Sequence, residues 1–479
     1  MATLSSLGVG AGFDTESVVS KLVALEKAPA QKIQSENSKL NTKLSTWGRV
    51  QSAFAALRDA SAALNRPDFW RATTATSSDA TAVSVTTGNS TPTGSYSVQV
   101  NALATSQFVS SGAFASKASP VGEGTLRISL GTYESDGGEP PAITFAAKAA
   151  AQAIEIEIGP GDNTLEKIRD RINSANAGVT AALITDAAGT RLVMRGPSGA
   201  SNAFKVEVAE GASPGLSALA YDASTGGTSS MTRTQSASNA QATINGLSVS
   251  SETNSFSDVL DGMSLQVSRV TASPVEVTVA QDTAAMRKGI DDFVGAYNSL
   301  VGLIRVQTLY DEASKTAGPL QGDSTATGLL SQIRRLASTS TGATSAFERL
   351  SDVGLELNKD GTLKVNSTKL QSAMGKLPEL ARFFSNSDDG NPAANGIAQR
   401  FREIAAKVVG SDGAISTRTD GLRATIKRND EKISRLEDRV ALIEARLRKQ
   451  YTALDTNMGN LTALQSYVSQ QLAQLNKSS

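Results

Sequence analysis

The stretch IKRNDEKISRLEDRVALIEARL, residues 426–447, decides the fold of the C-terminal part of this chain. Its aliphatic residues recur every seven positions, and the same spacing continues beyond it towards the C-terminus. The members of this series are Ile426, Ile433, Val440, Leu447, Leu454, Leu461, Val468 and Leu475. A seven-residue apolar repeat is typical of a coiled coil, because it keeps one stripe of a helix against a partner helix. The pattern therefore predicts a long C-terminal helix that packs on other helices.

The positions that accompany this series are mixed. Leu422, Leu436, Ile443 and Leu464 are apolar, whereas Asn429, Gln450, Asn457 and Gln471 are polar. The polar members weaken the predicted seam towards the C-terminus. Acidic residues repeat on one flank and basic residues on the other, namely Asp430, Glu437 and Glu444 against Lys432, Arg439 and Arg446. Such flanks attract in a parallel pair of identical helices, although each contact contributes only a few tenths of a kcal/mol.

A second apolar seam lies near the N-terminus. Ile33, Leu40, Trp47 and Phe54 stand seven residues apart, within a helical pattern over residues 14–66. Asp14 is the expected N-cap, and Pro29 is expected to interrupt the helix. Together with the C-terminal series and its companion Leu464, these four residues are the positions at which we expect packing against another subunit or partner. A helical leg built from both ends of the chain follows from the two seams.

Strand patterns fill the centre of the chain. Val83 and Val85 alternate with polar residues, Val275 and Val277 do the same far downstream, and a turn signal ING stands at residues 244–246. The insert between these segments combines strands with a short helix that Asn163 and Glu166 are expected to cap as a capping box. We therefore predict a multidomain α+β protein: a coiled-coil or helical-bundle leg formed by both termini, with two β-rich head domains, one inserted in the other.

The predicted division of the chain has five parts. They are an N-terminal flexible or helical segment (1–40), a helical leg domain (41–70 plus 283–425), a β-rich domain (71–106 plus 236–282), an inserted α+β domain (107–235) and a C-terminal coiled-coil segment (426–479). A chain of 479 residues is expected to form several domains.

The composition excludes several classes of function. The chain has no histidine and no cysteine, which rules out His-based relays, thiolate nucleophiles, disulfides and the usual zinc sites. Its 46 basic and 46 acidic side chains cancel, which argues against nucleic-acid or membrane binding. No apolar run reaches the roughly 18 residues that a membrane-spanning helix needs. We expect no enzyme, no cofactor and no metal, and no cleavable secretory signal at the N-terminus.

Three local patterns suggest chemistry and are better explained by structure. The glycines in GVGAG, residues 8–12, follow no strand and suit a hinge before a helix better than a phosphate loop. The stretch DDGN at 388–391 lacks the distal glutamate of a calcium loop. Glu155 and Glu157 are a conceivable glycosidase pair, but they alternate with isoleucines and so belong to the wet face of a strand.

Several strings together resemble the bacterial flagellar filament cap proteins, the hook-associated protein 2 family. They are GVGAGFD at residues 8–14, DDFVGAYN at 291–298, LQGDS at 320–324 and, most specific, DVGLELNKDGTL at 352–363. Residues 163–204 are similar to a module that flagellins and hook-associated proteins share. The resemblance covers the whole chain in the family's order.

The resemblance implies a secreted, extracellular structural protein at the tip of the bacterial flagellum. It implies export in an unfolded state by the flagellar type III machinery with its chaperone. It also implies a homo-oligomeric ring at the filament tip that helps flagellin to fold and insert, next to hook-associated junction proteins. Alternatives are another axial flagellar protein at the hook–filament junction, or a surface adhesin that uses the β domains.

Overall fold

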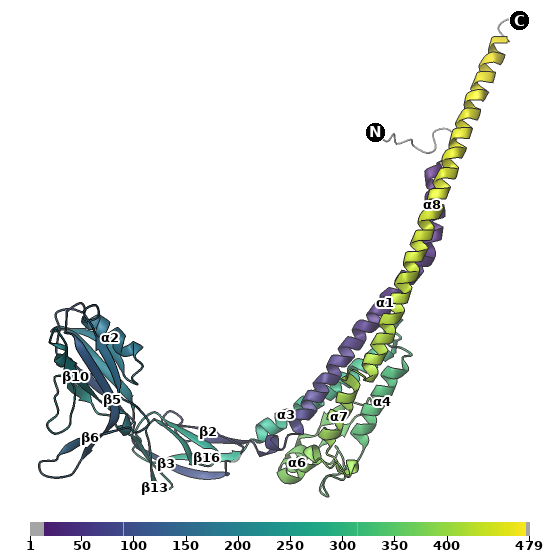
Figure 1. Cartoon of the computed structure of the whole chain (residues 1–479). Helices are drawn as coiled ribbons and strands as arrows, with labels where there is room; N and C mark the ends of the chain where they lie inside the picture. Colours follow the sequence, from purple (N-terminus) through teal and green to yellow (C-terminus); the bar gives the residue numbers. More distant parts are fainter. Residues whose placement is uncertain (1–13, 90, 314, 476–479) are drawn as a thin grey trace. The chain divides into compact units, whose positions relative to one another are not determined.

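The chain folds into two compact units. Unit 1 comprises the chain up to Trp70 and from Thr283 onward, and unit 2 comprises Arg71–Asp282. The computed structural model describes residues 14–89, 91–313 and 315–475, without the side chains of 258–260 and 474–475. The expected GVGAG hinge at residues 8–12 lies outside these residues. Figure 1 shows that unit 1 consists mainly of helices and unit 2 mainly of strands.

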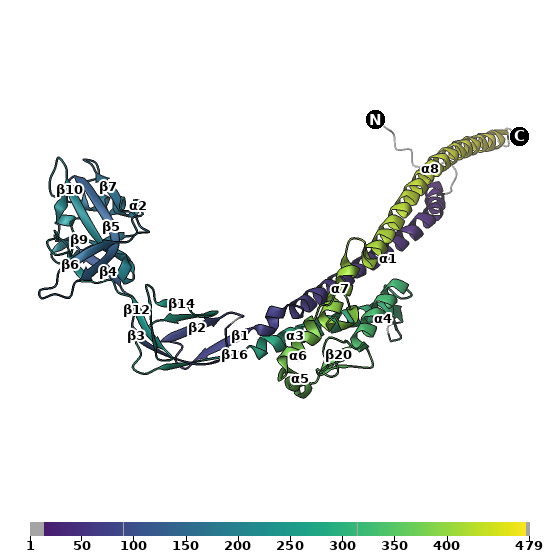
Figure 2. The same ribbon diagram turned by 60° about the horizontal axis from the view of Figure 1, so that its bottom comes forward.

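Unit 1 is built around two long helices that pair side by side. They are α1 (Thr15–Leu64) and α8 (Ala414–Leu475), and they run antiparallel, as the views of Figures 1 and 2 agree. The remaining elements of unit 1 are η1 (Pro67–Arg71), α3 (Thr283–Thr308), β17 (Tyr310–Asp311), β18 (Thr316–Ala317), α4 (Ser324–Ser338), β19 (Leu355–Leu357), β20 (Leu363–Val365), α5 (Ser367–Met374), α6 (Leu377–Ser385), η4 (Pro392–Ala394) and α7 (Ile397–Val409).

The beginning of α1 confirms one expectation and corrects another. The Asp14 side chain accepts a hydrogen bond from the backbone N–H of Ser17, as an N-cap does. The expected interruption at Pro29 is wrong, because α1 continues through it to Leu64. Proline removes one backbone hydrogen bond. Helix α1 nevertheless packs on α8 on both sides of this point, through Val23 before it and Asn37 after it. Tertiary packing here outweighs a local helix breaker.

The C-terminal part of α1 belongs to the main core of unit 1. Trp47 and Phe54 are fully buried there among side chains of α3, α4, α6 and α7. The indole of Trp70 donates a hydrogen bond to the carbonyl of Leu64 at 2.8 Å and stacks on Phe384. This core anchors the two long helices at one end, because Leu422 of α8 is buried in it as well.

Unit 2 starts and ends in the same sheets. Strand β1 pairs with β16, and β3 pairs with both β12 and β16, so strands from both ends of the unit alternate. A second sheet has the order β14-β15-β2. We call these strands the base: β1 (Thr73–Ser77), β2 (Val83–Thr87), β3 (Gly94–Ala102), β12 (Ala240–Ile244), β13 (Leu247–Ser251), β14 (Ser255–Leu260), β15 (Met263–Val267) and β16 (Val275–Gln281). The predicted turn is confirmed: Asn245 and Gly246 join β12 to β13 with positive φ.

The inserted module lies between β3 and β12 of the base in sequence. Its sheets have the orders β10-β5-β6, with β7 also on β5, and β11-β4-β9-β8. Its elements are β4 (Ser106–Ser110), β5 (Gly124–Ser135), β6 (Ile143–Ala147), β7 (Ile154–Ile158), α2 (Leu165–Ser174), β8 (Thr180–Asp186), β9 (Gly189–Ser198), η2 (Ala200–Asn202), β10 (Ala203–Glu210), η3 (Leu216–Leu219) and β11 (Thr232–Gln235).

The expected capping box of α2 is wrong. The N-cap residue is Thr164, and the side chain of Asn163 donates to Glu123. The first N–H groups of α2 donate instead to backbone carbonyls of a preceding loop, Leu165 to Ser119 and Glu166 to Lys117. A neighbouring loop thus satisfies the free donors that a capping box would otherwise satisfy.

The fold class is confirmed. Helices from both ends of the chain form one unit, and a β-rich module is inserted within a second β-rich region. The five-part division given above remains a prediction in its details. Within the described residues, no helix has an apolar stretch long enough to span a lipid bilayer.

Candidate partner-binding surface

The outer parts of α1 and α8 are held together by a small apolar cluster. Val19 and Val23 of α1 are buried against Val440 of α8, and Leu447 and Tyr451 pack beside them. These side chains recur at helical spacing on the facing sides of the two helices, which is how amphipathic helices bury a stripe. The cluster is separate from the main core of unit 1, so the outer pair depends on its own contacts.

A buried polar layer lies in the middle of the pair. Asn37 and Asn429 are each only 7% exposed, and the Asn429 amide donates to the Asn37 carbonyl oxygen at 2.9 Å. The Asn37 amide in turn donates to the carboxylate of Asp430 at 2.7 Å. Shifting either helix by one turn would leave these amides buried without partners, which is costly. The layer therefore fixes the register of α1 on α8.

An ion pair closes the described pair near its outer end. Arg448 of α8 donates two hydrogen bonds to the carboxylate of Glu16, at 2.8 and 2.9 Å, and a third to Glu444 at 3.1 Å. The hydrogen bonds to Glu16 and then to Glu444 raise the pKa of the Arg448 guanidinium. The pair is exposed to solvent, so it adds orientation more than stability.

Beyond Tyr451 the same face of α8 is uncovered in the part of the chain that the structure describes. Val440 is 4% exposed, whereas Leu461 is 59% exposed and Leu472 is 58% exposed. We call this surface the outer stripe. It consists of Leu454, Met458, Leu461, Val468 and Leu472, with Leu464 at its edge. Their spacing of three, four or seven residues puts the first five on one side of the helix.

The outer stripe has the chemistry of a packing surface. From Thr452 to Leu475 the only charged residue in the sequence is Asp455, and the residues around the stripe are mainly Thr, Asn, Gln and Ser. An apolar row with neutral polar neighbours can be covered by another helix without desolvating charges. The surface therefore suits a protein partner with an apolar helix face.

The predicted partner-packing residues fall into three groups. Trp47 and Phe54 lie inside the core of unit 1, and Leu40 packs against that core. Ile33, Ile426, Ile433, Val440 and Leu447 lie along the α1–α8 pair, buried or half-buried. Leu454, Leu461, Leu464 and Val468 are exposed, and Leu475 lies in α8 with its side chain outside the described part. Contact of any of them with a partner stays a prediction, and the exposed group is the one available for it.

Two residues of the surface were missed in the sequence. Met458 and Leu472 follow members of the heptad series by four residues, and Gln465 between them hid the second row. Asn37 was also missed, because a lone asparagine in a helix usually faces water, and only its partner on α8 shows that it is buried.

The residues that suggested chemistry have structural roles. Glu155 and Glu157 are exposed on β7, where the carboxylate of Glu155 lies 3.9 Å from the guanidinium of Arg127. The carboxylate of Asp388 accepts backbone N–H bonds from Gly390 and Asn391, as in a turn. No group of three or more acidic residues able to hold a metal ion occurs among the described residues.

Two family descriptions match the chain. "Flagellar hook-associated protein 2 N-terminus" matches residues 11–107, and "Flagellar hook-associated protein 2 C-terminus" matches residues 237–463. The matched ranges include α1, the strands of the base and most of α8, so they cover both units. The inserted module lies between the two ranges.

Relatives and a solved structure extend the similarity over nearly the whole chain. The B-type flagellar hook-associated protein 2 of Pseudomonas aeruginosa is 32% identical, with 98% of each chain covered. The flagellar hook-associated protein 2 of Escherichia coli K12 is 30% identical, again with 98% of each covered. The crystal structure of the D1-D2-D3 domains of the flagellar cap protein FliD from Escherichia coli superposes with a TM-score of 0.64 and 28% identity, covering 79% of this chain and 99% of that one.

Proposed function

This chain belongs to the flagellar hook-associated protein 2 family, and we propose that it is the structural capping protein at the distal tip of a bacterial flagellar filament. In this role it forms an oligomeric ring that promotes the folding and insertion of exported flagellin. The similarity to a flagellar cap protein of known structure over both units supports the proposal. The matched families and relatives are structural flagellar proteins, and none of them points to catalysis.

The observation that carries the proposal is the outer stripe of α8. The face that packs on α1 up to Tyr451 continues as an exposed apolar row through Leu472. A cap must bind neighbouring subunits and filament, and a partner helix that covers this row would bury it as α1 buries Val440. Burial of each leucine contributes roughly 1.5–3 kcal/mol, so a few such positions are enough for a specific contact.

The partners follow from this role. We infer contacts with further copies of the chain, with flagellin and with hook-associated junction proteins. We also infer export, with a dedicated chaperone, by the flagellar type III machinery to the outside of the cell. Among these, the second copy and flagellin are the partners for which the outer stripe is the expected contact.

The triple variant L461D/L464D/V468D tests the role of the outer stripe. Each aspartate would have to be buried without a partner when the stripe is covered, at a cost of several kcal/mol in total. Cells that carry this variant are expected to export it and flagellin, to shed flagellin as monomer into the medium, and to swim poorly. Swimming in soft agar and flagellin in the culture supernatant are the two measurements.

A matched control introduces the same three aspartates into the same part of α8, but on the side opposite the outer stripe. Ala463, Ser466 and Gln470 are exposed on the opposite side of the same two turns of α8. A463D/S466D/Q470D is therefore expected to leave swimming and filament length unchanged. Normal filaments with the stripe variant, or equal defects with both variants, would contradict the proposed contact.

A further inference from the structure

The chain crosses between the base of unit 2 and the inserted module at two adjacent points. One crossing joins β3 to β4, and the other joins β11 to β12. Thr105 of the first and Ser238 of the second exchange backbone hydrogen bonds at 2.9 and 3.1 Å, and their hydroxyls lie 2.8 Å apart. Two neighbouring crossings form a single narrow neck. A neck of two crossings can act as a pivot unless other contacts fix the angle of the module.

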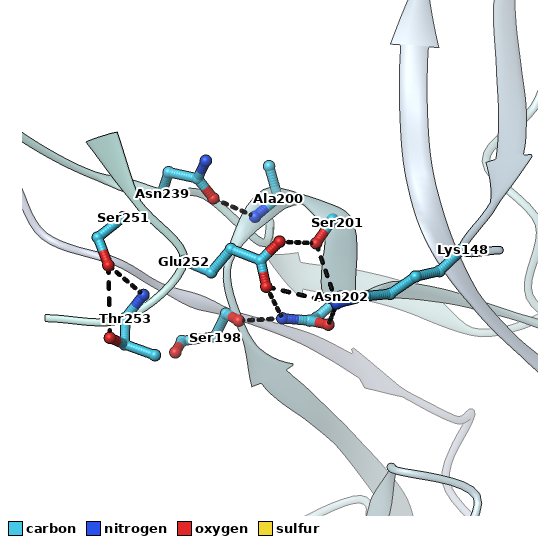
Figure 3. A network of polar contacts seen from close by, with 9 residues as sticks. All are labelled: Lys148, Ser198, Ala200, Ser201, Asn202, Asn239, Ser251, Glu252 and Thr253. Atoms are coloured by element: carbon cyan, nitrogen blue, oxygen red, sulfur yellow. Dashed lines mark hydrogen bonds and ion pairs between the residues drawn. The ribbon is translucent and has the colours of Figure 1, made fainter. Parts of the chain in front are cut away.

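A third contact connects the two parts through one carboxylate. Glu252 lies in the turn between β13 and β14 of the base, and the side chains that it meets all belong to the module (Figure 3). It accepts a hydrogen bond from the hydroxyl of Ser201, and its other oxygen lies 3.3 Å from both the Lys148 ammonium and the Asn202 amide. Lys148 follows β6, whereas Ser201 and Asn202 are in η2, so the carboxylate gathers two separate segments of the module.

The module residues around Glu252 are themselves fixed. The Lys148 ammonium donates to the Asn202 carbonyl oxygen at 2.7 Å, and the Asn202 amide donates to the backbone of Ser198 at 2.6 Å. Lys148 is the one charged side chain in contact with Glu252 within the described part of the chain. The hydrogen bond from Ser201, with those from Lys148 and Asn202, lowers the pKa of Glu252.

The backbones also meet closely at this contact. Gly199 has a φ of +100°, and a Cβ added to it would lie 2.6 Å from the Cβ of Glu252. The next N–H, that of Ala200, donates at 2.7 Å to the side chain of Asn239, a residue of the second crossing. Only glycine fits such an approach. The turn that bears Glu252 is therefore in direct backbone contact with the module.

We propose that Glu252 is an orientation latch, which holds the inserted module at one angle to the base of unit 2 by binding Lys148, Ser201 and Asn202. The two crossings define the neck, and the latch removes the rotation that the neck would allow. A half-exposed carboxylate with one cation contributes little by itself. A connected network of hydrogen bonds is stronger than its isolated pairs. The proposal concerns unit 2 alone and does not depend on the proposed capping role.

The absence of cysteine from the chain makes a distance measurement direct. In the full-length variant I184C/L247C, one spin label sits on exposed β8 of the module and the other on exposed β13 of the base. Pulsed electron–electron double resonance, with unlabelled protein in excess to suppress distances between copies, then reports the orientation. We expect one narrow distance distribution for this parent, and a broadened or split distribution when E252A is added.

Two further variants make the test decisive. E276A removes an exposed glutamate from β16 of the same base and is expected to leave the distribution narrow. K148M/S201A removes two of the three described bonds from the module side, including the one from a cation, and is expected to broaden the distribution as E252A does. It decides the matter if E252A fails to fold. A distribution as narrow as the parent's in the folded latch variant would overturn the proposal. It would mean that the two crossings fix the orientation unaided.

Discussion

The two halves of α8 carry the same apolar pattern in different surroundings. Between Ala414 and Tyr451 the seam lies against α1 and the core of unit 1, so that Leu422 and Val440 are buried. Between Thr452 and Leu475 the seam continues in phase, and Leu454 and Leu461 are exposed. A heptad pattern therefore specifies a face that must be covered, and the surrounding fold decides whether the same chain or another one covers it.

The polar companions of the seam show the same difference. Asn429, in the covered half, meets Asn37 and becomes part of a register-fixing layer. Asn457 and Gln471, in the uncovered half, are exposed beside the outer stripe. A polar residue in a seam is unfavourable only until its partner is present. Whether such a residue stabilises or destabilises the helix pair therefore depends on which helix packs against it.

The largest effect on stability is expected when the same kind of substitution is compared in the covered and the uncovered half of α8. V440D places a charge in the buried cluster with Val19 and Val23, at a cost of about 3–5 kcal/mol. We expect the outer part of α1 to lose hydrogen-exchange protection by a factor on the order of one hundred or more, while the main core keeps its own. L461D, the same kind of change in the uncovered half, should leave exchange in the isolated subunit unchanged. Equal exchange in the two variants would remove the distinction between the halves.

Much of this arrangement was predictable from local pattern. The two seams, the strands of the base and the turn at Asn245 all have short-range signals, because helical and strand periodicities depend on residues close in sequence. The direction of the α1–α8 pairing did not follow from these patterns. The charged flanks of α8 concern a pair of two α8 helices, which stays a prediction, and they do not apply to α1, which lies antiparallel to α8. What holds α1 on α8 near its outer end is the burial of Val19, Val23 and Val440.

The errors have a common physical cause. Pro29 and the Asn163–Glu166 spacing are local signals, and contacts distant in sequence overruled both. Glu252 had no signal at all, because its role depends on Lys148 and Ser201, which lie far from it in the sequence. For the candidate surface, the heptad series identified Leu454, Leu461 and Val468, but only the fold shows which members are exposed.

A middle-sized effect should come from the polar layer of the covered half. N429L leaves the buried carbonyl oxygen of Asn37 without its donor, which costs about 1–3 kcal/mol. The double variant N37L/N429L removes both polar groups and should recover most of that loss, while no longer favouring one register. Hydrogen exchange along α1 measures the stability of the helix pair. Disulfide cross-linking after the additional substitutions Q34C and S434C measures the register of α1 on α8. A double variant as destabilised as the single one would show that the layer does not act as a pair.

The smallest effect is expected where the covered half ends. R448Q breaks the two hydrogen bonds to Glu16, but both side chains are half-exposed and water can replace the lost partner. The melting temperature should therefore change by no more than about 2 °C at physiological salt.

The informative quantity is the salt dependence of hydrogen-exchange protection at the start of α1. Protection of the first turns of α1 should fall with added salt in the parent, because ions screen an exposed pair, and should be nearly independent of salt in R448Q. K449Q, which changes the neighbouring exposed cation, serves as the control and should retain the parent's salt dependence. If R448Q instead exposed the cluster around Val19 as strongly as V440D does, the ion pair and not the apolar contact would mark where the covered half of α8 ends.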